Sequence, residues 1–169
     1  MILGLDISTS CTGVTVLHKD GLIESNEAWD FKKEKTFLDK CKKASERIEK
    51  LYEIYPNVEK IYVEESLQAF RAGFSSAKTL ITLAKFNGIL SWMLFDKYGV
   101  RPEYISASAA RKSCGIVIPR GTKAKQVVME YMLKNHPWFS VEYTKFGNIK
   151  THFYDMADSF VVAEAGRRK

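Results

Sequence analysis

The pattern of apolar and polar residues predicts a chain that begins with strands. Residues 2–7 are almost entirely apolar, and two further strand-like runs, 13–19 and 22–30, are separated by the turn signal Asp20-Gly21. These three runs predict an antiparallel meander. Two shorter strands are expected at 60–65 and 103–107. Because the first of these follows a helical segment, it should return parallel to an earlier strand through a crossover.

Apolar residues recur at helical spacing in most of the remaining chain. Helices are predicted at 35–55, 77–98, 122–135 and 154–166, together with a short helix that carries Arg111 and Lys112. The 77–98 helix is apolar on more than one face, so it should be buried on more than one side, in the core or partly against another subunit. Residues 137–153 are rich in aromatics without a helical period and should be irregular or a short hairpin. We expect one α/β domain over 1–169, with a mixed five-stranded sheet flanked by helices.

Composition narrows the class of protein. The 169 residues carry 26 Lys and Arg against 20 Asp and Glu, a formal charge of +6, which favours polyanionic partners such as nucleic acid. A basic protein that binds no polyanion would fit this charge equally well. Three widely spaced cysteines indicate neither a disulfide framework nor a zinc site. With no apolar run of membrane-spanning length and no leader pattern, we expect a soluble cytoplasmic protein, neither secreted nor in a membrane.

The acids provide the strongest chemical signal. Asp6 lies in an apolar strand, where a carboxylate is costly unless it is paired, hydrogen-bonded or bound to metal. Glu64 and Glu65 end a second strand, and alternation should leave one of them in solvent. Asp155 and Asp158 are three residues apart, on one face of the last helix. They could equally be acids that complement a helix N-terminus.

Convergence of these acids would create strong repulsion unless divalent cations neutralise it. Hard oxygen ligands without His or Cys select Mg²⁺ or Mn²⁺. Two such ions could activate a water and stabilise the leaving oxygen during attack on a phosphodiester. Of the three histidines, His18 and His136 are expected to be ordinary, whereas His152 lies near the terminal acids and could assist there.

The ordered motifs resemble the RuvC-type Holliday junction resolvases of the RNase H-like superfamily. The resemblance runs from Ile2 to Ala163 and rests on GLDIS with the following Thr12-Gly13, YVEES, SASAARKS, TKAKQVV and DMAD. It implies an RNase H-like fold and a homodimer that binds branched DNA, especially four-way junctions, and cuts it with paired symmetric nicks.

The resemblance also assigns residues. It implies that the carboxylates of an acidic quartet bind two Mg²⁺ ions and that basic residues contact the scissile phosphate or the junction backbone. The quartet is Asp6, Glu64, Asp155 and Asp158; Lys112 is also placed in the catalytic set, with one of Lys123 or Lys125 as the second matching base. The expected DNA contacts are Phe70, Arg71 and Phe74 in a loop, with Arg111, Lys112, Arg120, Lys123 and Lys125.

Three alternatives stay open at this point. A flap, fork or RNA–DNA hybrid nuclease of the same fold would use the same acids. A sugar-kinase or actin-like fold also begins with an apolar strand, an Asp and small residues, but needs two lobes. A catalytically inactive junction-binding protein would keep the fold and basic surface, although retention of all four acids argues against it.

Overall fold

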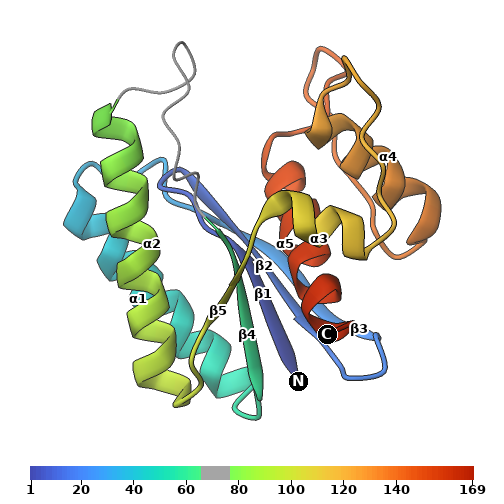
Figure 1. The fold of residues 1–169 in the computed structure, drawn as a ribbon. Coiled ribbons are helices and arrows are strands. Elements are labelled where there is room, and N and C mark those ends of the chain that lie inside the picture. The colour runs from blue at the N-terminus through green and yellow to red at the C-terminus, as the bar shows by residue number, and fades with distance from the viewer. Residues whose placement is uncertain (66–76) are drawn as a thin grey trace.

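A computed structural model describes residues 1–65 and 77–169 as a five-stranded sheet with helices on both faces (Figure 1). The strand order is β3-β2-β1-β4-β5, so β1 is central. The strands are β1 (Ile2–Asp6), β2 (Cys11–Leu17), β3 (Ile23–Asp30), β4 (Lys60–Glu64) and β5 (Glu103–Ile105).

The strand directions agree with the sequence predictions. The first three strands form the antiparallel meander, and β4 pairs parallel to β1 after a helical crossover. Strand β5 then pairs parallel to β4. The parallel strands β1 and β4 therefore end at the same edge of the sheet, where Asp6 and Glu64 are their last residues.

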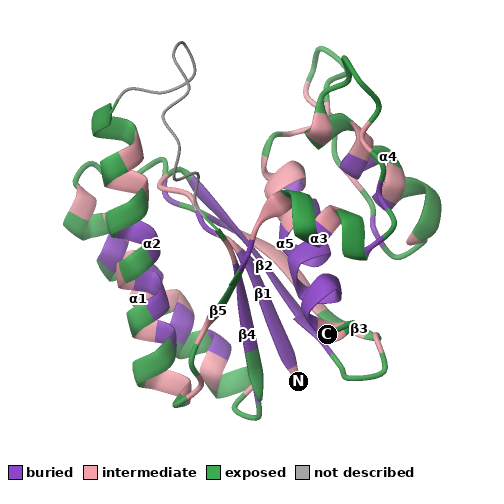
Figure 2. Ribbon diagram, viewed as in Figure 1, coloured by how far each residue is buried: buried purple, intermediate pink, exposed green. Residues whose placement is uncertain are grey.

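The described helices form two layers. Helices α1 (Phe37–Ile54) and α2 (Ala77–Tyr98) cover one face of the sheet. The other face carries α5 (His152–Arg167), which lies across β1 and β2, with α3 (Ala107–Ser113) and α4 (Ala124–Asn135) packed outside it. Each layer has its own apolar core, and Figure 2 shows the buried central strands between them.

Alternation along β1 and β4 decides which core each side chain enters. Leu3 and Leu5 belong to the core under α1 and α2, whereas Ile2 and Tyr62 belong to the core under α5. Since side chains two residues apart share a face of a strand, Asp6 and Glu64 are directed to the α5 side.

Helix α2 is buried on one side within the single chain, so the first of the two predicted forms of burial, entirely in the core, does not hold. Its buried residues, which include Phe86, Leu90 and Leu94, lie on one face only. The side chains of Ile81, Trp92 and Phe95 are 55%, 62% and 45% exposed. The described chain therefore buries α2 on one side and leaves an apolar stripe on the other.

Residues 136–151 connect α4 to α5. They contain a short hairpin in which Tyr143 and Ile149 form an antiparallel bridge, in line with one of the two predicted forms. None of the helices in the described ranges is long and apolar enough to cross a membrane.

Candidate functional site

The acids gather where β1, β4 and α5 meet. Asp6 and Glu64 end adjacent parallel strands, and the first turns of α5 bring Asp155 and Asp158 over that edge. The negative charges of Glu64, Asp158 and Asp155 all raise the pKa of Asp6. The four carboxylates are thus close enough to interact, although they come from three separate elements.

Gly13 allows α5 to approach the sheet. It lies opposite Asp6 in the register of β1 and β2. A Cβ at this position would lie only 1.9 Å from the backbone oxygen of Asp155 and 2.9 Å from the backbone nitrogen of Met156. Any side chain here would push the start of α5 away from Asp6.

A buried polar network fixes α5 beside Gly13. The Thr15 hydroxyl lies 2.8 Å from that of Ser159, which donates to the backbone oxygen of Met156 at 2.8 Å. The Asn26 amide donates to the Thr15 hydroxyl at 2.7 Å and to the Met156 oxygen at 2.9 Å. Because Met156 lies between Asp155 and Asp158, this network sets the position of both acids.

The turn between β1 and β2 is held by its own side chains. The Ser8 hydroxyl donates to the backbone oxygen of Cys11 at 2.7 Å, and the Thr12 hydroxyl donates to the backbone oxygen of Ser8 at 3.2 Å. The small polar residues of this turn therefore stabilise the end of β1 that carries Asp6.

Electrostatics in the cluster oppose full ionisation. Burial and then the charge of Asp158 raise the pKa of Glu64 to about 7, although Arg111 and Lys125 act in the opposite direction. Burial also raises the pKa of Asp158. For Asp6, burial is the largest cause, followed by the neighbouring carboxylates. The site therefore has a strong requirement for positive charge.

Lys125 supplies part of that charge. Its Nζ lies 3.2 Å from Oδ1 of Asp155 and 3.6 Å from Oδ2 of Asp158. Burial would lower the pKa of Lys125, but the charges of Asp6, Asp158 and Asp155 outweigh this and raise it. In the described part of the chain, no three Asp, Glu, His or Cys side chains are already grouped as metal ligands. The Lys125 ammonium group therefore forms ion pairs with two of the acids.

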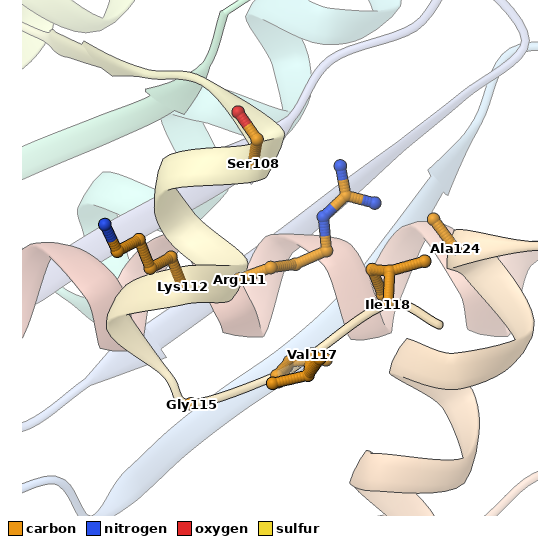
Figure 3. Close-up of a pocket in the computed structure, with 8 residues that line it drawn as sticks. Ser108, Arg111, Lys112, Gly115, Val117, Ile118 and Ala124 are labelled. Atoms are coloured by element: carbon orange, nitrogen blue, oxygen red, sulfur yellow. The ribbon is translucent and has the colours of Figure 1, made fainter. Parts of the chain in front are cut away.

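A pocket of about 510 Å³ lies between α3, the segment that follows it and the start of α4 (Figure 3). Arg111, whose charge acts on both Glu64 and Asp158, forms one wall and extends toward Ile118 and Ala124. Lys112 projects from the other side of α3. The pocket lining is mostly apolar, with Arg111 as a cation in its wall.

A smaller cavity of about 250 Å³ adjoins the acids from the α5 side. Lys125 and Asp155 belong to its lining, which is completed by Ser10, Cys11, Lys32, Thr151 and Tyr154. Burial, followed by the charge of Asp155, raises the pKa of the Cys11 thiol to about 12, so this thiol keeps its proton. The contribution of Lys32 and Tyr154 was not predicted, because no sequence pattern separates them from other surface residues.

The basic residues predicted as DNA contacts divide into two groups. Lys125 and Arg111 lie against the acids, whereas Lys112, Arg120 and Lys123 are exposed and belong to no ion pair among the described residues. Lys123 is the N-cap residue of α4. Of the two possible matching bases, Lys125 is the one beside the cluster. Phe70, Arg71 and Phe74 lie outside the described residues.

The structure also places Glu65 and the histidines His152 and His136. Glu65 is exposed, as expected for one of the two glutamates. His152 is the first residue of α5, three positions before Asp155, and its ring stacks on Phe153 at 4.3 Å between centroids. His136 packs against Phe160 at 4.5 Å between ring centroids, away from the acids, in agreement with an ordinary role.

The topology defines the class of fold. A mixed five-stranded sheet with a central β1, an antiparallel meander on one side and parallel strands on the other is the RNase H-like architecture of RuvC. The predicted RuvC-like fold, a mixed five-stranded sheet flanked by helices, is confirmed. No protein-family model matches the sequence, and no curated protein matches it either.

Solved structures supply the particular likenesses. Thermus thermophilus RuvC in complex with a Holliday junction substrate superposes with a TM-score of 0.68 at 14% identity, over 97% of this chain and 90% of that one. Another structure of RuvC from the same organism gives 0.61 at 16% identity, over 97% and 91%. The yeast mitochondrial Holliday junction resolvase Ydc2 gives 0.57 at 14% identity, over 99% and 77%.

Proposed function

We propose that this chain is a divalent-metal-dependent endonuclease that resolves four-way DNA junctions by paired symmetric nicks. The observation that carries the proposal is the convergence of Asp6, Glu64, Asp155 and Asp158 at one edge of a RuvC-like fold, in a chain of formal charge +6. A basic protein attracts the DNA backbone, and an acidic cluster inside it needs cations that hydrolysis can use.

The carboxylates fit Mg²⁺. Four acid side chains without histidine or thiolate ligands are the hard donor set that Mg²⁺ or Mn²⁺ prefers. The raised pKa values of Asp6, Glu64 and Asp158 express a shortage of positive charge that Lys125 alone does not remove. We assign the four acids as ligands of two such ions, which when bound would activate a water and stabilise the leaving oxygen.

The remaining groups of the site act on the DNA. Lys125 can turn its ammonium from the acids to a phosphate oxygen once bound metal neutralises the carboxylates. Arg111, whose charge also acts on Glu64, can hold the phosphate in position. Lys112, Arg120 and Lys123 provide exposed charge for the flanking backbone. Hydrolysis breaks one phosphorus–oxygen bond of the strand and forms one to the oxygen of water.

We further propose that two copies pair through α2. Ile81, Gly88, Trp92 and Phe95 form an exposed and mainly apolar stripe in the single chain, interrupted by Lys85. Gly88 lies in mid-helix, where glycine is unfavourable, and a Cβ there would meet nothing within 4 Å. Its use in the stripe is explained if a second copy of α2 approaches closely at this point.

Pairing gives the reaction its symmetry. A twofold dimer presents two equivalent acid clusters to two strands of a junction that are related by the same axis. Each protomer then makes one nick. Paired nicks at equivalent positions are the outcome that distinguishes junction resolution from cleavage of a single strand.

The decisive experiment compares a four-way junction, a fork, a flap, an RNA–DNA hybrid and linear duplex in Mg²⁺, with mapping of every nick. We expect symmetric nicks in the junction and none without a divalent cation. Asp155→Asn should abolish cleavage and leave junction binding largely intact. Preferential cleavage of the fork, flap or hybrid would show that this DNA, and not the four-way junction, is the substrate. Cleavage by Asp155→Asn at the wild-type rate would refute the assignment of Asp155 as a metal ligand.

A further inference from the structure

The hairpin at residues 142–150, between α4 and α5, has a well-defined tip. The backbone nitrogen of Thr144 donates to the oxygen of Asn148 at 2.7 Å, and that of Gly147 donates to the oxygen of Thr144 at 3.0 Å. The Thr144 hydroxyl accepts from the backbone nitrogens of Phe146 and Asn148, each at 3.3 Å. Gly147 has a φ of 78°, which closes the turn. The tip is therefore fixed by its own hydrogen bonds.

The base of the hairpin is fixed as well. The backbone nitrogen of Lys150 donates to the oxygen of Glu142 at 2.9 Å, and the two side chains form an ion pair. Val141 and Ile149 pack against the core beneath α5. The hairpin is thus a rigid projection anchored in the same core that positions Asp155.

This rigid tip holds aromatic rings in solvent. The side chains of Tyr143 and Phe146 are 58% and 78% exposed. Burying a Phe side chain contributes roughly 1.5–3 kcal/mol, which the described chain does not obtain from Phe146. The Lys145 ammonium lies 4.9 Å from the centroid of the Phe146 ring. An exposed ring beside a cation matches the faces and the charge of nucleic acid bases and their backbone.

The hairpin also leads directly to the acids. Its last residue is followed by Thr151 and then by α5, whose first turn carries Asp155. Thr151 and Tyr154 line the 250 Å³ cavity together with Lys32 and Lys125. This cavity forms a polar, positively charged connection between the base of the hairpin and the acid cluster.

We propose that the 142–150 hairpin binds DNA next to the cleavage site and that Phe146 stacks on a nucleobase of the bound strand. The strand backbone crosses the cavity between the hairpin and the acids, where Lys32 and Lys125 neutralise its charge. The inference rests on the proposed nuclease function but assigns a contact outside the acid cluster. Stacking is sequence-tolerant, so the hairpin contributes affinity and positioning without a fixed recognition sequence.

The test measures binding of four-way junctions that carry 2-aminopurine at successive positions around the mapped cut, with EDTA present to prevent cleavage. Base stacking on an aromatic residue contributes about 1–3 kcal/mol, so Phe146→Ala should weaken binding by roughly 5- to 150-fold. Phe146→Leu should behave like Phe146→Ala, because leucine is apolar but offers no ring, whereas Phe146→Trp should retain the affinity. The aminopurine emission should be quenched at one position by the wild type and not by Phe146→Leu.

The matched control is Leu22→Ala. Leu22 is 66% exposed and lies in the turn between β2 and β3, at the end of the sheet opposite Asp6. This variant should bind as the wild type does. Lys145→Ala is a second test. If Lys145 contacts one phosphate, its loss should reduce the slope of the logarithm of the binding constant against the logarithm of the salt concentration by about one.

The outcomes separate the two proposals. Junction cleavage by the wild type together with unchanged binding by Phe146→Leu would overturn the hairpin assignment and leave the nuclease function standing. Binding that depends on Phe146 in a protein that cuts no junction would support the hairpin and refute the proposed function. A wild-type protein that binds neither branched, single-stranded nor duplex DNA would overturn both.

Discussion

Replacing Glu64 with glutamine tests the electrostatics of the acid cluster without any DNA. In the folded, metal-free protein the pKa of Glu64 is raised from 4.5 to about 7, chiefly by burial and by the charge of Asp158. An unfolded chain lacks both causes. Between these two pKa values the folded protein therefore holds a proton that the unfolded chain has released.

This difference fixes the sign of the pH dependence. Where the folded state binds more protons than the unfolded state, the free energy of unfolding falls as the pH rises. Each unit of pKa shift corresponds to about 1.4 kcal/mol, so ionising Glu64 should cost the fold about 3 kcal/mol by pH 8. The cost is shared with Asp6 and Asp158, whose pKa values are raised for related reasons. Glu64→Gln should remove much of it.

Urea denaturation in EDTA, repeated from pH 5 to pH 8, measures the effect. Wild type and Glu64→Gln should have similar stability at the acidic end, and the variant should gain an advantage of about 3 kcal/mol by pH 8. Glu130→Gln, at an exposed position of α4, is the control and should follow the wild-type curve.

Added Mg²⁺ should narrow the difference in stability between the two proteins. A ligand that binds only the folded state stabilises it by about 2.7 kcal/mol at 100 times its dissociation constant. The wild type should gain this at pH 8, and Glu64→Gln should gain less because it has lost a carboxylate. Parallel curves for the two proteins across the whole pH range in EDTA would refute the proposed electrostatics of the cluster.

Three further substitutions test other parts of the structure. Gly13→Ala should lower the free energy of unfolding by about 1–3 kcal/mol and abolish cleavage, because its Cβ would meet the backbone of α5; denaturation and nicking assays measure both. Lys125→Met should increase Mg²⁺ affinity in thermal-shift titrations, since the acids lose their resident cation, whereas Lys123→Met should leave it unchanged. Gly88→Leu should stabilise the monomer helix by about 0.5–1 kcal/mol and yet weaken dimerisation in sedimentation experiments; a wild type that sediments only at 19.3 kDa would contradict the dimer.

The fold could be predicted from the sequence because its strongest patterns are local. Apolar runs, the Asp20-Gly21 turn and the helical periods place the strands and the four longer helices of the described residues within about two positions of their observed bounds, whereas α3 was predicted without bounds. The parallel pairing of β1 and β4 follows from the crossover rule. Which side chains of a helix are buried is harder to predict than where the helix begins and ends. In α4, for example, Met129 is buried, whereas Leu133, four residues later, is 41% exposed.

The elements that carry the four acids could also be predicted, but their surroundings could not. The choice between Lys123 and Lys125 depends on the residue at which α4 begins, and the expected start at 122 precedes the observed start at Ala124. A shift of two residues turns a side chain to nearly the opposite side of a helix. Gly13 belongs to one of the sequence motifs, but the motif does not show why glycine is needed there. The need comes from the close approach of the Asp155 backbone, and Asp155 is far away in the sequence.

The acid cluster joins the first strand of the described chain to its last helix. Such a long separation means that the cluster forms only after α5 has been synthesised and has docked across β1 and β2. A nascent chain on the ribosome already carries Asp6 and Glu64, but it has no complete set of metal ligands. If the cluster cuts DNA as proposed, incomplete translation products cannot do so, and the cell is exposed only to nuclease that has finished folding.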